Sequence, residues 1–316
     1  MAADTPTAAP HSDPRQHTQS PGMGNWIRLI ALGIIWGGSF MAVELALRDV
    51  GPLSIAAARV TLGAILLTAL TYAFGQRLPR PGRVWLYVLG LGVFSNALPF
   101  SLLSWGQQYV PSAFAGVSMA VVPLFVLPLA FLMVPGETLH RRKVIGFLIG
   151  FLGVALLIGI GDIGAALAGG TLLAKLACIA ATLSYAVGAI ITRLSPLVPH
   201  MAFSAAGLIV ASIFTLPAAL LLEGAPGPVG PTALTALIYL AIMPTAVATL
   251  LLVSVIQSAG PSFLSLVNYQ VPIWSIIFGL VFLSETLPPN FMVAVALILV
   301  GVLISQSRRR RQAQAA

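Results

Sequence analysis

Two segments of the chain repeat one pattern. Residues 111–139 read PSAFAGVSMAVVPLFVLPLAFLMVPGETL, and residues 261–287 read PSFLSLVNYQVPIWSIIFGLVFLSETL. Each segment opens with Pro-Ser, carries a proline (Pro123 or Pro272) within an apolar run, and closes with Glu-Thr-Leu. The offset between the copies changes only from 150 residues at the start to 148 residues at the end. Such an internal repeat indicates a duplicated architecture, and the fold should be predicted from it first.

Composition places this duplication in a membrane. Hydrophobic residues make up 58% of the 316 and charged residues 8%, and the mean hydropathy is +0.99. An ordinary soluble domain has about a quarter of its residues charged. Apolar runs close to the ~20 residues that span a bilayer take up nearly all of the chain. We therefore predict an all-α integral membrane protein with ten transmembrane helices at residues 26–47, 52–74, 84–103, 111–134, 143–160, 171–193, 199–222, 233–256, 261–283 and 289–306.

The number of helices in each copy predicts how the copies are related. Five is an odd number, so the second copy must lie upside down relative to the first. Inverted repeats around a central cavity are typical of secondary transporters, whose binding site lies near the midplane at the repeat interface; a purely structural role is the alternative. We predict a disordered tail at 1–24, a first five-helix repeat at 25–162, a second at 163–306 and a basic tail at 307–316.

The basic residues indicate topology. The net charge is +8, but lysines and arginines occur in short clusters between apolar runs, which is typical of membrane topology and not of a nucleic-acid surface. If the N-terminus is cytoplasmic, 13 of the 16 basic residues fall on the cytoplasmic side. We therefore predict both termini in the cytoplasm of a multi-pass protein of a bacterial cytoplasmic membrane. The expected partners are the lipid bilayer and a small-molecule substrate, without nucleic acid.

Two further observations bear on cofactors and assembly. The one cysteine, Cys178, lies inside an apolar run, and the four histidines have no ligand spacing, so no metal site and no cofactor are expected. Gly146, Gly150 and Gly153 form a small-residue stripe that permits close helix contact. That stripe predicts either tight packing within the bundle or a dimer interface, so both a monomer and a homodimer stay open.

At this point the chain resembles the EamA-type family of the drug/metabolite transporter superfamily. The resemblance depends on IIWGGSF (34–40), AAARVTLGAILLTAL (56–70) and the repeated P…P…ETL…GVxLI pattern, which closes with GVALLIG (153–159) and GVLIS (301–305). It implies a ten-helix bundle whose cavity is lined mainly by the first, third and fourth helices and their second-repeat mates. It also implies export of amino acids, related metabolites or drug-like cations, although some relatives work in uptake.

Four candidate substrate-binding residues lie together in the ninth predicted helix. Asn268, Tyr269 and Gln270 are adjacent polar residues near the bilayer centre, and Trp274 follows. Buried polar side chains are costly unless they are paired or hydrated. Since successive residues are about 100° apart on a helix, the three cannot share one face. We expect at least one to line the transport pathway.

Further candidates come from aromatic and polar residues at mid-depth. Trp36 and Ser39 in the first predicted helix match Tyr185 and Gly188 in the sixth, and Asn96 lies near mid-depth in the third. Tryptophan and tyrosine normally concentrate at the membrane interfaces, so deep positions indicate either a cavity wall or helix packing. We interpret the set Trp105, Gln107, Gln108 and Tyr109 as anchors at the outer end of the third helix.

Prolines and intramembrane charges complete the candidates. Pro123 and Pro272 remove one helix hydrogen bond each, and they act either as matched gating bends or as static kinks. Glu44 and Arg59 are the acid and the arginine within predicted helix interiors, where an unpaired arginine is costly. We predict a Glu44–Arg59 ion pair or polar network near the outer gate.

The leading functional hypothesis is a secondary transporter that exports small metabolites such as amino acids by alternating access. No histidine or carboxylate lies at mid-membrane for a proton relay, so a neutral or zwitterionic substrate fits better than a cation. The alternatives are efflux of drugs or quaternary cations and metabolite uptake. An integral membrane enzyme acting on lipid-linked substrates would need clustered Asp, Glu, His or Cys, and the sequence shows no such cluster.

Overall fold

The structure, a computed structural model, describes residues 22–159 and 171–306. The first repeat comprises five helical segments. They are α1 (Met23–Ala46), α2 (Pro52–Ala73), α3 (Val84–Gly92) continued by the π turn η1 (Val93–Ala97) and α4 (Leu98–Gly106), α5 (Ser112–Ser118) continued by the 3-10 turn η2 (Met119–Val121) and α6 (Val122–Met133), and α7 (Arg141–Ile158). The predictions for residues 1–21, for the repeat boundary at 162–163 and for the tail at 307–316 lie outside the described residues.

The second repeat has the same five segments. They are α9 (Thr171–Leu194), α10 (His200–Leu222), α11 (Pro231–Ala241) continued by the π turn η4 (Ile242–Val247) and α12 (Ala248–Ala259), α13 (Pro261–Leu264) followed by α14 (Val267–Phe282), and α15 (Phe291–Gln306). Within the described ranges the predicted all-helical fold is confirmed. The third helix extends to Gly106, three residues beyond its predicted end, and the fifth begins at Arg141, so that its basic cluster lies in the first turn.

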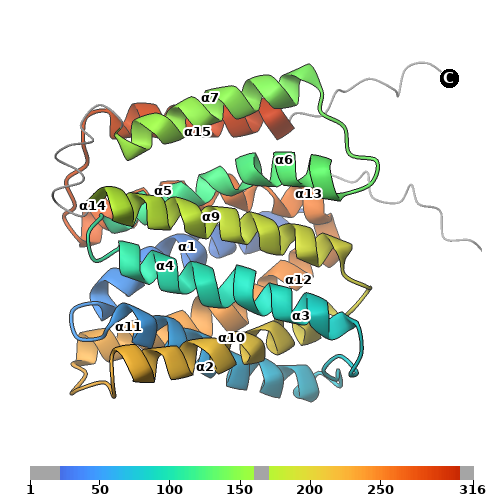
Figure 1. Cartoon of the computed structure of the whole chain (residues 1–316), viewed down its shortest axis with the longest axis vertical. Helices are drawn as coiled ribbons and strands as arrows, with labels where there is room; N and C mark the ends of the chain where they lie inside the picture. The colour runs from blue at the N-terminus through green and yellow to red at the C-terminus, as the bar shows by residue number, and fades with distance from the viewer. Residues whose placement is uncertain (1–21, 160–170, 307–316) are drawn as a thin grey trace, which may run out of the picture.

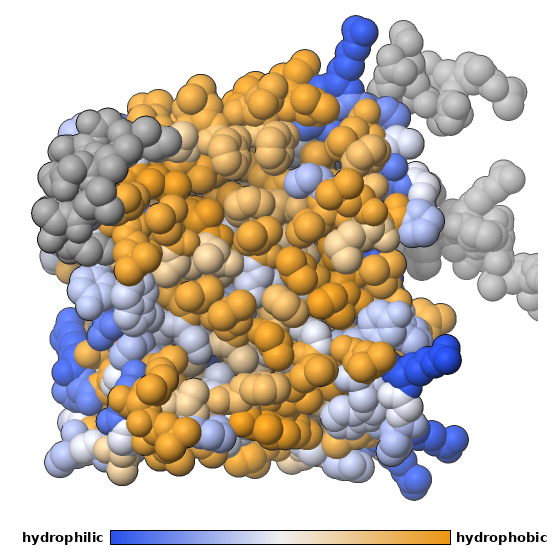
Figure 2. Space-filling view, viewed as in Figure 1, coloured by the Kyte–Doolittle hydropathy of each residue, from blue (hydrophilic) through white to orange (hydrophobic). Residues whose placement is uncertain are grey.

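The bundle has the surface of a membrane protein. Seven helices of the described part are long and apolar enough to span a bilayer, and two shorter apolar helices accompany them. Hydrophobic residues cover the middle of the visible face, and hydrophilic residues gather at its two ends (Figure 2). Large apolar side chains point outward; Leu132 in α6 is 75% exposed and Leu221 in α10 is 84% exposed. Such exposure would be a liability in water and is expected against lipid.

The two repeats are inverted, as predicted. In Figure 1, α7 and α15 lie side by side and run in opposite directions, and α2 lies against α10. We call the end where α1 begins and α15 ends the termini end, and the opposite end the far end. The loops after α1, α4, α10 and α14 lie at the far end.

The glycine stripe of α7 is used inside the bundle. A Cβ atom at Gly146 would lie 2.5 Å from the carbonyl oxygen of Gly301 in α15, and one at Gly153 would lie 2.8 Å from the backbone nitrogen of Ile298. Because the obstacle is backbone in both cases, the helices can approach this closely only where glycine stands. The alternative use of this stripe as a dimer interface is therefore wrong: α15 occupies it.

Carboxylates tie the two repeats together at the far end. Asp49 accepts a hydrogen bond from the backbone N–H of Gly230, just before α11, at 2.9 Å. Glu223 accepts from the N–H groups of Leu53 and Ser54 in the first turn of α2, at 2.9 and 2.8 Å. The first N–H groups of a helix have no partner within it, and they favour negative charge.

The repeat acid Glu285 makes the third contact of this kind. Its carboxylate accepts from the N–H groups of Ser112 and Ala113 at the start of α5, at 2.7 and 3.1 Å. In all three contacts, a carboxylate from one repeat satisfies the N-terminus of a helix in the other. Charge-assisted hydrogen bonds therefore hold the two repeats together at the far end.

The π turns are a second matched feature, which the sequence analysis missed. Asn96 Nδ2 in η1 donates to the carbonyl oxygen of Leu91 at 3.2 Å, and Thr245 Oγ1 in η4 donates to that of Leu240 at 3.0 Å. Each turn also presents a backbone carbonyl to the first helix of the other repeat. Ser184 Oγ in α9 donates to Phe94 O at 2.8 Å, and Trp36 Nε1 in α1 donates to Pro244 O at 3.3 Å. These bonds satisfy carbonyls for which lipid offers no donor.

The contact between α7 and α15 generates a stability prediction. We expect Gly301→Val to lower the free energy of unfolding by about 1–3 kcal/mol, because its side chain would be forced into the backbone of Gly146 and Gly150. The matched control is Gly24→Val, where a Cβ meets nothing within 4 Å. Thermal unfolding of both purified variants in detergent measures the difference; equal stability of the two variants would contradict the packing argument.

Candidate functional site

A central cavity of about 890 Å³ lies between the two repeats. It runs from Gln107, near the far end, to Glu137, Lys143 and Gln306 at the termini end. Its volume is within the ~300–1,000 Å³ typical of small-molecule sites. Its walls come from α1, α4, α6, α9, α12 and α14, with Arg59 added from α2 and the last residues of α15 at the mouth. The lining helices implied by the family resemblance are thus found, with three additions: α2 through Arg59, α7 through Lys143, and α15 through Ser305 and Gln306.

Each main helix contributes one stripe of side chains to this cavity. From α1 the lining residues are Trp36, Ser39, Phe40 and Val43; from α4 and the residue that caps it they are Phe100, Leu103, Ser104 and Gln107. Both sets follow the i, i+3, i+4, i+7 spacing of a single helix face. The α6 stripe comprises Val122, Pro123, Val126, Leu127 and Ala130, and α9 contributes Tyr185, Ala189 and Arg193.

The end of the cavity near the far end is formed by a buried amide. Gln107 is 3% exposed, and its Nε2 donates to the carbonyl oxygen of Phe40 at 2.8 Å. Its Oε1 is buried without a hydrogen-bond partner. The prediction that Gln107 is an interfacial anchor is therefore wrong. The stripe that it shares with Phe100, Leu103 and Ser104 is the signal in the sequence that identifies it as a lining residue.

Arg59 lies deep in the cavity, over an aromatic ring. Its Cζ is 3.8 Å from the centroid of the Phe100 ring. The Tyr185 ring meets Phe100 edge to face, with centroids 6.3 Å apart. Nε of Arg59 is buried without a hydrogen-bond partner. Within the described residues, Arg59 forms no ion pair.

The predicted Glu44–Arg59 ion pair is therefore absent from the part of the chain that the structure describes. Arg59 lines the cavity and Glu44 does not. Glu44 follows Val43, the last lining residue of α1, and is turned about 100° around the helix from it. Its Oε2 is buried without a hydrogen-bond partner. Spacing along the sequence placed both charges toward the outer side of the membrane, but the rotation of each helix points them in different directions.

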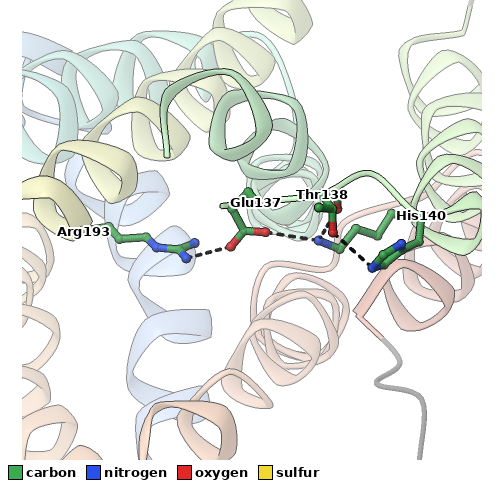
Figure 3. A network of polar contacts seen from close by, with 5 residues as sticks. Glu137, Thr138, His140 and Arg193 are labelled. Carbon is green, nitrogen blue, oxygen red and sulfur yellow. Dashed lines mark hydrogen bonds and ion pairs between the residues drawn. The ribbon is translucent and has the colours of Figure 1, made fainter. Parts of the chain in front are cut away.

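An ion-pair network lies at the mouth of the cavity. Glu137, in the loop after α6, is 2.7 Å from Nη2 of Arg193 in α9 and 3.3 Å from Nζ of Lys143 in α7 (Figure 3). In the same loop, Thr138 Oγ1 lies 3.1 Å from Nε2 of His140. Hydrogen bonds from Arg193 and then Lys143 hold the pKa of the Glu137 carboxyl below 4.5. The network joins the first repeat to the second at this end.

Half of the eight predicted substrate-binding residues line the cavity, and their role in binding stays a prediction. These are Trp36, Ser39, Tyr185 and Asn268. The other four are engaged elsewhere. Asn96 donates to Leu91 O in α3, just before its π turn, and Tyr269 donates to Gln306 Oε1 at 2.9 Å. Gln270 packs against Gly33, and Trp274 packs against Gly37.

The two candidate hinge prolines occupy different surroundings. Pro123 lines the cavity one residue after Val122, where α6 begins and the 3-10 turn η2 ends. Pro272 is buried inside α14, and the chain is irregular between α13 and α14, at Ser265 and Leu266. Each proline thus follows an interruption of its helix. Whether the interruptions move during transport stays a prediction.

A comparison with known families classifies the chain. A model of the EamA-like transporter family matches residues 25–159 and 170–306, which is most of the chain. The chain belongs to the EamA-like transporter family. It is therefore a transporter of the drug/metabolite type, as the repeat and its motifs predicted. In the described residues no group of three or more His, Cys, Asp or Glu is placed to hold a metal ion.

Relatives of this EamA-like transporter cover nearly all of its length. Protein PecM of Dickeya dadantii is 27% identical over 88% of this chain and 92% of its own. A probable terminal-alkyne amino-acid exporter of Streptantibioticus cattleyicolor is 24% identical over 90% and 95%. The uncharacterized inner membrane transporter YedA of Escherichia coli is 26% identical over 87% and 88%. One crystal structure of a protein superposes with a TM-score of 0.64 at 25% identity, covering 90% of this chain and 99% of that one.

The mouth network generates a pH prediction. Because the Glu137 pKa is lowered in the folded state, its ion pairs add full stability above pH 4.5, and this contribution is lost as the pH falls through the lowered pKa. We expect Glu137→Gln to lower the free energy of unfolding by about 1 kcal/mol or less at neutral pH, since the pair is partly exposed. Thermal unfolding of both proteins from pH 7 to pH 3 measures this, and the difference should shrink below pH 4.5. A difference that grows with acidification would contradict the assignment.

Proposed function

We propose that this protein is a secondary transporter of the cytoplasmic membrane that exports small metabolites, amino acids above all, by alternating access. The observation that carries this proposal is the cavity between two inverted repeats. Hydrogen bonds hold the repeats together at the far end, and the cavity reaches the exposed Gln306 at the termini end. Inverted-repeat carriers place their substrate at such an interface and expose it to one side at a time.

The contacts at the two ends support a switch between two states. At the far end, Asp49, Glu223 and Glu285 bind helix N-termini across the repeat boundary. At the termini end, the cavity reaches Glu137 and the exposed Gln306. In the proposed cycle the far-end contacts break and the mouth narrows, so that the cavity opens to the other side. The basic residues predict both termini in the cytoplasm, and in that topology the cavity opens toward the cytoplasm, which is where an exporter loads its substrate.

Two observations favour an amino acid as the substrate. The Streptantibioticus relative is named a probable terminal-alkyne amino-acid exporter. The charged residues that line the cavity are three cations (Arg59, Lys143 and Arg193) and one carboxylate, Glu137. A wall with this excess of positive charge repels drug-like cations and quaternary ammonium compounds. Export of such cations, and uptake instead of export, are the alternatives that the transport assay distinguishes.

The experiment is exchange in proteoliposomes. The purified full chain is reconstituted, and counterflow of radiolabelled amino acids is measured with and without an imposed proton gradient. We expect one or more apolar amino acids to exchange without dependence on the gradient. If amino acids move only when the proton gradient is imposed, the transport is proton-coupled and is not gradient-independent exchange. Glu44 is then the candidate proton carrier. No movement of any amino acid would overturn the amino-acid proposal and make organic cations the next panel.

A matched pair of variants ties transport to the cavity. Leu127 of α6 lines the cavity and Leu132 of the same helix is 75% exposed on the outer surface. We expect Leu127→Trp to lower the exchange rate by about tenfold or more, a barrier change of ~1.4 kcal/mol, because the added ring occupies the pathway. Leu132→Trp should exchange at the wild-type rate. Equal rates for the two variants would show that the substrate does not pass through this cavity.

A further inference from the structure

We propose that Arg59 is the docking point for the substrate, and that it binds a carboxylate group carried on an apolar molecule. This inference rests on the proposed transport function and names the chemistry of its binding site. The sequence predicts Glu44 as the anionic partner of Arg59. In this proposal, the carboxylate of the substrate is that partner instead.

The first observation is that Arg59 stands apart from the other charges in the cavity. Lys143 and Arg193 both bind Glu137 at the mouth, at 3.3 and 2.7 Å. The lining residues that share the deep part of the cavity with Arg59 come from α1, α4 and α9 and include Trp36, Phe100 and Tyr185. None of these is an acid. A single cation in an apolar enclosure attracts an anion strongly, because the low local dielectric screens the interaction between the two charges only weakly.

The second observation is that the guanidinium keeps its hydrogen-bond donors free. Phe100 covers its face, at 3.8 Å from Cζ to the ring centroid. The N–H groups of a guanidinium point outward in its plane, so stacking on a ring leaves them available to a planar acceptor. Nε is already shielded from solvent without a partner, and a buried donor in that state costs free energy that an arriving acceptor regains. A carboxylate accepts such a fork through two parallel bonds.

The third observation is that neighbouring donors are already used. Trp36 Nε1 donates to Pro244 O at 3.3 Å, and Ser39 Oγ donates to Trp36 O at 2.6 Å. Gln107 donates to Phe40 O. These bonds hold the walls in place and engage donors of Trp36, Ser39 and Gln107, whereas no hydrogen bond engages the guanidinium of Arg59 within the described residues. The rings of Trp36, Phe100 and Tyr185 then form the surface for the apolar part of the substrate.

The experiment compares two probes that share one carbon skeleton and similar size, one with a carboxylate and the other with a neutral amide in its place. We use 3-phenylpropanoate and its neutral amide, 3-phenylpropanamide, with the purified full chain in lipid nanodiscs at pH 7, and measure binding by calorimetry. The wild-type protein should bind the carboxylate about 10- to 100-fold more tightly than the amide, the range for one charge-assisted hydrogen-bond interaction. Equal affinities, or no binding of the carboxylate, would overturn the proposal without any variant.

The variants then assign the discrimination to Arg59. In Arg59→Gln the preference for carboxylate over amide should fall to within about twofold, with the loss confined to the carboxylate. In Arg59→Lys, which keeps the charge without the fork, the preference should be intermediate. Arg48→Gln, on an exposed position at the end of α1, is the control for loss of positive charge and should keep the wild-type preference. If Arg59→Gln stays folded and still discriminates, the carboxylate binds elsewhere and the proposal is wrong.

Failure of this inference is distinguishable from failure of the proposed function. The probes carry no ammonium group and need not be transported, so the binding experiment stands apart from amino-acid exchange. Carboxylate preference with no amino-acid exchange would retain the Arg59 site and reject amino acids as substrates. Amino-acid exchange with equal binding of the two probes would retain the function and reject the Arg59 site.

Discussion

The requirement that every backbone polar group find a partner where lipid offers none shapes this protein more than any other constraint. Within the membrane-spanning segments it is met inside each helix, and at the more polar far end the helix N-termini find carboxylates of the opposite repeat. Asp49, Glu223 and Glu285 each satisfy the N-terminus of a helix that lies more than 150 residues away in the chain. The same requirement explains the π turns, whose carbonyls at Phe94 and Pro244 receive side-chain donors from α9 and α1. The repeats are thus joined by hydrogen bonds as well as by packing.

The repeat is symmetric in sequence and asymmetric in use. Glu137 and Glu285 occupy equivalent places after their proline-containing helices. Glu285 accepts backbone N–H groups at the far end, whereas Glu137 binds Arg193 and Lys143 at the mouth. A carrier built from inverted repeats has to hold its two ends differently in any one state, because equivalent contacts at both ends would seal the cavity. Glu137 and Glu285 show this difference between the two ends directly, because equivalent acids have different partners.

Much of the fold follows from the sequence, and less of the site does. Apolar runs and the repeated motif suffice for ten helices and their inversion, because those depend on length, hydrophobicity and number. The site depends on the rotation of each helix about its axis. For this reason Trp36 and Tyr185 line the cavity as predicted, whereas Gln270 and Trp274 pack against α1. Gln107 is the converse case: its position near a helix end indicated an anchor, yet its face of α4 points into the cavity.

What the sequence determined by itself was the class of protein, the count and inversion of its helices, and the set of polar groups that had to find a place in a bilayer. Tertiary structure alone decided which partner each group has. Glu44 and Arg59 are close in sequence and were both predicted toward the same side of the membrane, but α1 and α2 turn them apart, and Arg59 lies over Phe100 from α4. The reason is that a partner is chosen by the direction of a side chain as well as its depth. Direction follows from how ten helices pack together, and no local pattern records it.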